Sequence, residues 1–221
     1  MPSPLTGLSF DAFLFDMDGT ILTSLKAAER VWTAWAVRHG LDVPSFLPTI
    51  HGVQASETIR RLNLPGVDPQ AEAALITQNE VDDVDGIEPI AGASAFLRAL
   101  PPTRWAIVTS APRRLALRRL EAAGLPVPQV LVTAEDVQHG KPAPDCFLLA
   151  ADRLGVEIRT CLVFEDSPAG IASGQAAGAH LLVVTATHDH PLATPHATIP
   201  SYDALRPTQS EAGTLGLAQS G

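Results

Sequence analysis

Two aspartates separated by one residue follow an apolar run near the start of the chain. In "AFLFDMDGT" they are Asp16 and Asp18, and Gly19 comes directly after them. A carboxylate at the end of a buried strand is costly to desolvate unless a cation meets it. The spacing allows one side-chain oxygen and one backbone carbonyl oxygen to share a hard cation such as Mg²⁺, which prefers oxygen ligands. We therefore expect a Mg²⁺ site here, with Gly19 letting the chain turn away from it.

A second acidic pair, Glu165 and Asp166, follows the apolar run "CLVF" and precedes a helical pattern that begins at "SP". Two such pairs at strand ends are hard to explain by packing. Carboxylates gathered at one edge of a sheet repel one another unless a metal ion lies among them. We expect Glu165 and Asp166 to lie near the first pair and to add to the metal site.

Hydroxyl groups follow a third apolar run, "WAIV", as Thr109 and Ser110. They stand at the start of a helical pattern, where free N–H groups and the helix dipole favour a phosphate. The alternative for Ser110 is that it only caps the helix. Lys141, in "GKPAP", precedes a proline and is therefore held extended. It is either a solvated surface lysine or a cation that offsets the charge of a carboxylate–phosphate pair.

The elements that must position these groups follow from the hydrophobic pattern. Short apolar runs predict buried strands, and their continuous apolar character is typical of a parallel sheet covered on both faces. Helical patterns alternate with them, which predicts an α/β fold with a Rossmann-like, doubly wound parallel sheet over 8–22 and 86–208. Ligands bind such sheets at the carboxyl ends of the strands. The predicted strands are 12–15, 105–109, 130–133, 161–164 and 181–184.

One segment breaks the alternation. Residues 23–85 carry helical patterns and no convincing strand, which predicts an all-helical cap inserted over the carboxyl ends of the sheet. Trp32 and Trp35 lie on one apolar stripe of the first helix, and we expect them to form the cap core rather than a stacking surface for a ligand. The segment 209–221 is small, polar and glycine-rich, and is expected to be a flexible tail.

Composition limits the partners. The formal net charge is −9, which argues against nucleic acid or an anionic membrane. We find no secretory leader pattern and no apolar run of the roughly 18 residues that a membrane span needs. Cys146 and Cys161 lie in apolar segments without metal-ligand spacing, so we expect free buried thiols and a cytoplasmic protein. We also expect a monomer or a weak homodimer.

Taken in order, these motifs resemble those of the haloacid dehalogenase (HAD)-like hydrolase superfamily. The matching stretches are "FDMDGTILTS", "WAIVTSAP", "HGKPAPD" and "VFEDSPAG", and the resemblance covers about residues 10–187. The position of the helical cap and the stretch "IHG" look like the sugar-phosphate phosphatase branch. That branch includes the 2-deoxyglucose-6-phosphate, glycerol-phosphate and hexitol-phosphate phosphatases.

The resemblance implies a role for each motif. Asp16 would attack phosphorus and form an aspartyl-phosphate, Asp18 would act as general acid and base, and Lys141 would neutralise developing charge. The substrate would be a small phosphorylated sugar or polyol. The implied Mg²⁺ ligands are Asp16, the backbone carbonyl of Asp18, and Asp166. Glu165 would bind the ion directly or through water, or would contact one of the ligands. The implied substrate-binding residues are Thr109, Ser110, Ser24, His51, Gly52 and Arg60.

Two alternatives stay open. The first is a phosphosugar mutase of the β-phosphoglucomutase type, although Ala28 stands where those relatives carry a cap histidine. The second is a non-catalytic binding module on the same fold, which is disfavoured because none of the motifs is degraded. Thr23 replaces the aspartate that the family often has at the hinge into the cap.

Overall fold

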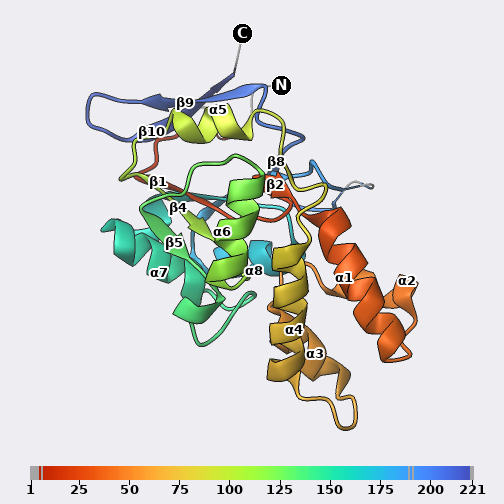
Figure 1. Cartoon of the computed structure of the whole chain (residues 1–221). Coiled ribbons are helices and arrows are strands. Elements are labelled where there is room, and N and C mark those ends of the chain that lie inside the picture. The colour runs from red at the N-terminus through yellow and green to blue at the C-terminus, as the bar shows by residue number, and fades with distance from the viewer. Residues whose placement is uncertain (1–4, 6, 189, 191, 220–221) are drawn as a thin grey trace.

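A six-stranded parallel sheet forms the centre of the protein (Figure 1). The computed structural model describes residues 5, 7–188, 190 and 192–219. The strand order β5-β4-β1-β6-β7-β8 and the parallel pairing confirm the predicted Rossmann-like α/β class. Each of the five strands predicted from the sequence is present within one residue at either end, and the sixth strand of the sheet, β8, was not predicted. The strands are β1 (Ala12–Phe15), β4 (Trp105–Val108), β5 (Val130–Val132), β6 (Cys161–Glu165), β7 (His180–Val184) and β8 (Ala197–Ile199).

Alternate residues of the central strand β1 enter two separate cores. Phe13 and Phe15 point into the cluster that includes α5 (Ala93–Arg98) and α6 (Arg113–Ala122). Ala12 and Leu14 point into the cluster on the other face, with α7 (Asp145–Leu154) and α8 (Pro168–Ala177). Because both faces are covered by helices, every position of β1 is buried, and this explains the unbroken apolar run.

The segment between β2 (Leu22–Thr23) and β3 (Glu88–Pro89) is helical. These two short strands pair antiparallel and form the base of the inserted cap. The cap has its own core, in which Trp32 and Trp35 are each 4% exposed and contact Phe46 with ring centroids 5.7 Å apart. Both tryptophans therefore pack as predicted. The cap helices are α1 (Leu25–Arg38), α2 (Val43–Phe46), η1 (Leu47–Thr49), α3 (Ala55–Leu62) and α4 (Pro69–Asp82).

The helix ends follow local capping chemistry. Asp68 accepts hydrogen bonds from the backbone N–H groups of Gln70 and Ala71 at the start of α4, and Pro69 occupies the first turn. Ser167 caps α8 in the same way through Gly170 N. Short 3₁₀ turns, η2 (Ala134–Asp136) and η3 (Ile158–Thr160), complete the connections.

The prediction of a flexible tail over 209–221 is wrong for the described residues. The chain instead forms an antiparallel hairpin of β9 (Leu205–Gln209) and β10 (Leu215–Gln219), which lies over α5 at the top of Figure 1. Leu215 and Leu217 alternate with small residues, are 1% and 6% exposed, and join the core through a bridge to Phe10. The alternation of apolar and small residues that indicates a strand is short here, and the segment is rich in glycine, so the sequence pattern did not predict it. Residues 220 and 221 lie outside the described part.

Both cysteines are free and buried, as predicted. Among the described residues, the helices are too short or too polar for any of them to cross a bilayer.

The two-faced core predicts where truncation is costly. Phe164 is fully buried and stacks on Phe15 with ring centroids 4.4 Å apart. Phe164→Ala should lower the free energy of unfolding by about 3–5 kcal/mol because it leaves a cavity. Leu148→Ala, at a 42% exposed position of α7, should change it by less than about 0.5 kcal/mol. Urea denaturation followed by circular dichroism measures both, and equal losses would contradict this account of the core.

Candidate active site

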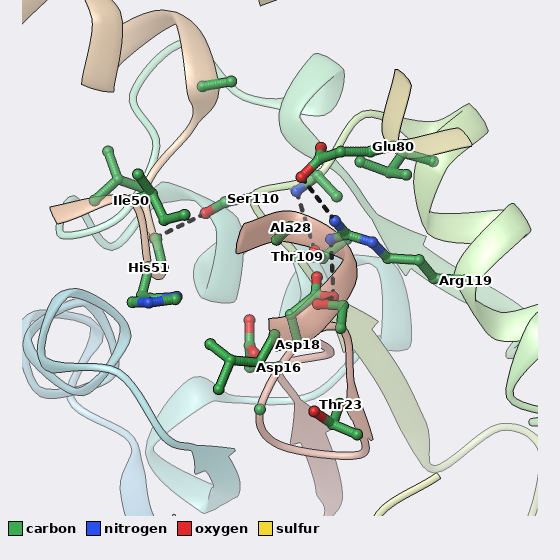
Figure 2. Close-up of a pocket in the computed structure, with 18 of the residues that line it drawn as sticks. Asp16, Asp18, Thr23, Ala28, Ile50, His51, Glu80, Thr109, Ser110 and Arg119 are labelled. Atoms are coloured by element: carbon green, nitrogen blue, oxygen red, sulfur yellow. Dashed lines mark hydrogen bonds and ion pairs between the residues drawn. The ribbon is translucent and has the colours of Figure 1, made fainter. Parts of the chain in front are cut away.

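The predicted acidic and hydroxyl groups meet at the carboxyl edge of the sheet. Asp16 follows β1, Thr109 follows the neighbouring β4, and Glu165 ends β6 on the other side of β1. Because these three strands are parallel neighbours, their ends lie side by side. Asp16 and Thr109 border a cavity of about 120 Å³ beneath the cap, and Glu165 lies buried behind them (Figure 2).

Lys141 reaches this edge from the loop before α7 and is 3% exposed. Its Nζ donates to Asp16 Oδ1 at 2.5 Å, to Glu165 Oε1 at 2.7 Å and to the Val108 carbonyl at 3.2 Å. Burial alone would lower the pKa of Lys141, but Asp16 and Glu165 raise it above its usual range. The lysine is therefore a buried, fully bonded cation and not surface.

Glu165 is completely buried and both of its carboxylate oxygens are engaged. Oε2 accepts from the backbone N–H groups of Asp166 and Ser167, at 2.8 and 2.9 Å, and from Ser167 Oγ at 3.1 Å. A Cβ on Gly170 would lie 1.5 Å from Oε1, so α8 packs directly on this carboxylate. These contacts favour the indirect one of its predicted metal roles, in which Glu165 orients Lys141 and the start of α8.

The donor set fits a hard divalent cation. One oxygen each of Asp16, Glu165 and Asp166 lie within 4.8 Å of one another. The three carboxylates carry more negative charge than the one ammonium of Lys141 can offset, so the buried site has a negative formal charge. Burial raises the pKa of Asp16 to about 7, and burial followed by Glu165 and Asp16 raises the pKa of Asp166 well above its usual range. Oxygen ligands and this charge suit Mg²⁺, which Asp16 and Asp166 would hold.

Gly19 has the backbone conformation that the sequence predicts for the turn after the aspartates. Its φ is +88°, and a Cβ there would lie 2.0 Å from Asp166 Oδ2. The turn therefore passes directly against Asp166, and only glycine fits. Thr20 Oγ1 also donates to Asp166, at 3.3 Å.

Asp18 is held by two donors on one oxygen. Its Oδ1 accepts from Ser24 Oγ at 2.6 Å and from Arg119 Nη1 at 2.8 Å. Arg119 Nη2 donates in turn to Glu80 Oε1 at 3.1 Å. Asp18 is thus joined to α6 of the core and, through Arg119, to α4 of the cap (Figure 2).

Ser110 does not cap α6. Its Oγ donates to the Gly52 carbonyl at 3.1 Å, and the residue before α6 is Pro112. Gly52 has φ of +73°, and a Cβ there would lie 2.4 Å from Ser167 Oγ. The cap loop therefore touches the core at two residues, Ser110 and Ser167, and this close approach requires glycine. His51 borders the cavity beside it.

The structure brings together most of the predicted site residues but not all. Thr109 and Ser24 border the cavity with the aspartates. Arg60, predicted to contact substrate, does not border it: its exposed side chain pairs with Glu57, as does that of Arg61. Both arginines lie within one turn of Glu57 on the outer face of α3, so the prediction for Arg60 is wrong here.

Sequence reasoning missed Arg119 and Glu80, and it placed Trp32 only in the cap core, although all three line the cavity. The sequence did contain a pattern that could have identified Arg119 as a buried residue. Leu115, Ala116, Arg119 and Leu120 form the buried face of α6, so a charged residue stands on an apolar stripe. Such a residue needs a buried partner. Which partner it has depends on how the cap sits on the core.

The acidic cluster predicts a pH-dependent response to Mg²⁺. Because the pKa of Asp16 is raised to about 7, the metal-free folded protein holds more protons than the unfolded chain between pH about 4 and 7, and its stability falls as pH rises through that range. Bound Mg²⁺ requires the ionised carboxylates. MgCl₂ should therefore raise the melting temperature more at pH 8 than at pH 5.5.

Differential scanning fluorimetry with MgCl₂ or EDTA measures this effect. Asp166→Asn should lose most of the increment, whereas Asp152→Asn, an exposed position on α7, should keep it. Equal increments at the two pH values would contradict the cluster as the binding site.

Comparisons with known proteins find similar sequences and similar folds. The family model of haloacid dehalogenase-like hydrolases matches residues 10–178. The chain is 45% identical to hexitol phosphatase A of Escherichia coli over 183 residues, which cover 81% of this chain and 85% of that protein. It is 33% identical to 2-deoxyglucose-6-phosphate phosphatase 1 of Saccharomyces cerevisiae, with 82% of each chain covered.

A comparison with solved structures finds a similar fold. A hydrolase from Pseudomonas syringae superposes with a TM-score of 0.70 at 26% identity, covering 80% of this chain and 84% of that one.

Proposed function

The chain belongs to the haloacid dehalogenase-like hydrolase family, and we propose that it is a Mg²⁺-dependent phosphatase that hydrolyses a small sugar or polyol phosphate. The observation that carries the proposal is the position of Asp16, which lies beside Asp166 with one oxygen fixed by Lys141, at the floor of the cavity. The similarity to enzymes named for hexitol and 2-deoxyglucose-6-phosphate supports the substrate class.

In the proposed reaction Asp16 attacks phosphorus and forms an aspartyl-phosphate. Lys141 donates to Oδ1 of Asp16 and is itself oriented by Glu165, which leaves Oδ2 of Asp16 to attack. Mg²⁺, when bound, reduces the repulsion between this carboxylate and the phosphate. Thr109, Ser110 and the N–H groups that precede α6 bind the transferring phosphoryl oxygens.

Asp18 moves the proton. It protonates the departing alkoxide and then accepts a proton from the water that cleaves the aspartyl-phosphate. The hydrogen bonds from Ser24 and Arg119 both fall on Oδ1, so Oδ2 is the oxygen for proton transfer. Closure of the cap over the cavity excludes other water during the transfer.

A mutase is the second candidate. It would return the phosphoryl group to a sugar hydroxyl instead of to water. Ala28, at the position where the β-phosphoglucomutase type carries a histidine, borders the cavity, and its methyl group cannot carry a proton. Release of inorganic phosphate in step with substrate loss distinguishes hydrolysis from mutase activity.

The decisive measurement is metal-dependent phosphate release from para-nitrophenyl phosphate and from a panel of sugar and polyol phosphates. Wild-type protein should release phosphate with MgCl₂ and stop with excess EDTA. Asp16→Asn should lower kcat by on the order of 10⁴-fold or more, because no nucleophile remains. Asp152→Asn serves as the control with the same chemical change at an exposed site. Turnover by Asp16→Asn near that of the wild type would remove the assignment of the nucleophile.

Asp18→Asn should behave differently from Asp16→Asn. Loss of the general acid should lower kcat by about 10²- to 10⁴-fold. Binding of inorganic phosphate, measured by calorimetry with MgCl₂, should stay within a few fold of the wild type, because Asp16, Thr109 and Ser110 remain. A variant with normal kcat would show that another group transfers the proton.

A further inference from the structure

We propose that Arg119 and Glu80 select the substrate, by binding hydroxyl groups on the carbons next to the phosphate ester. The inference deepens the proposed function and rests on it: it names vicinal polyol phosphates as the substrate class that the site prefers over simple alkyl phosphates.

The first support is position. Arg119 and Glu80 are 5% and 6% exposed, yet both line the cavity that holds Asp16 and Asp18. Figure 2 shows Asp18, Arg119 and Glu80 joined in a row by their interactions. Arg119 belongs to the core and Glu80 to the cap, so the row crosses the site from the general acid to the cap wall.

The second support is the position that Asp18 requires of the leaving group. The ester oxygen of the leaving group must contact Asp18 to receive its proton. Arg119 contacts the same carboxylate at 2.8 Å, and Glu80 follows at 3.1 Å from the guanidinium. Because both residues also line the cavity, the carbons attached to the ester oxygen would lie near Arg119 and Glu80.

The third support is hydrogen-bonding chemistry. A guanidinium only donates and a carboxylate only accepts, whereas a hydroxyl does both. Two neighbouring hydroxyls can accept from Arg119 and donate to Glu80 at once. Arg119 Nε is buried without a hydrogen-bond partner among the described residues. Glu80 accepts from the side chains of Arg119 and Trp32, and a carboxylate can accept further hydrogen bonds. An alkyl chain would leave Arg119 Nε unpaired, and a site that leaves a polar group unpaired rejects such analogues strongly.

Two substrates that differ only in hydroxyls test the inference. Glycerol 1-phosphate and n-propyl phosphate share the three-carbon chain and the phosphate. With MgCl₂, the wild type should favour glycerol 1-phosphate in kcat/KM by about 10-fold or more. Glu80→Gln should reduce that ratio by about 10-fold, since a charged acceptor is lost.

The control is Glu72→Gln, which makes the same change on the same helix. Glu72 binds Trp35 and Arg38 on the cap and does not line the cavity, so this variant should keep the wild-type ratio. Glu80→Asp keeps the charge and provides a second variant should Glu80→Gln fail to give a cooperative melting transition. The ratio of kcat/KM values for Glu80→Asp should lie between that of the wild type and that expected for Glu80→Gln.

The outcomes separate the two proposals. A wild type without Mg²⁺-dependent release from any phosphate ester would overturn the proposed function. Given an active wild type, an absent preference for glycerol 1-phosphate would overturn the inference alone. So would an equal loss by the Glu80 variants on both substrates, which would make the Arg119–Glu80 pair a structural contact between core and cap.

Discussion

The buried ammonium of Lys141, between Asp16 and Glu165, is the interaction on which the site depends. Two carboxylates at neighbouring strand ends repel each other, and burial increases that repulsion because water no longer screens it. Lys141 offsets both charges at 2.5 and 2.7 Å. A charge buried in this way is tolerated only when its hydrogen bonds are complete, and here the Val108 carbonyl accepts the third. The arrangement links three parts of the chain that are distant in sequence.

The same interaction explains the local sequence around β6. Glu165 can face Lys141 only if α8 begins directly above it and carries no side chain at Gly170. Its second oxygen then accepts the first N–H groups after the strand, from Asp166 and Ser167. Asp166 is left facing Gly19 and the cavity, with a charge that the single ammonium does not balance. A divalent cation is the natural complement to that remaining charge.

The cap is joined to the core by polar contacts as well as by the chain itself. Gly52 meets Ser110 and Ser167 at one side of the cavity, and Glu80 meets Arg119 at the other. Gly52, Ser110, Glu80 and Arg119 all line the cavity. The position of the cap and the hydrogen bonds of the site are therefore coupled, because a shift of α4 or of the cap loop changes the partners of Arg119 and Ser110.

The sequence by itself determined five of the six strands of the core sheet, the presence of a helical insertion and the residues at the strand ends. Each of these depends on neighbours in the chain: continuous apolar runs followed by Asp16, Thr109 or Glu165. The hairpin at the carboxyl terminus was not predicted, because Leu215 and Leu217 alternate with glycine and alanine and their burial depends on Phe10, which is distant in the sequence. Only the tertiary structure decided that Lys141 is buried, that Arg60 faces outward and that Arg119 joins Asp18 to Glu80. In each case the partner lies in another segment, or the outcome depends on which helix face packs, and charge pairing across the fold leaves no local pattern in the sequence.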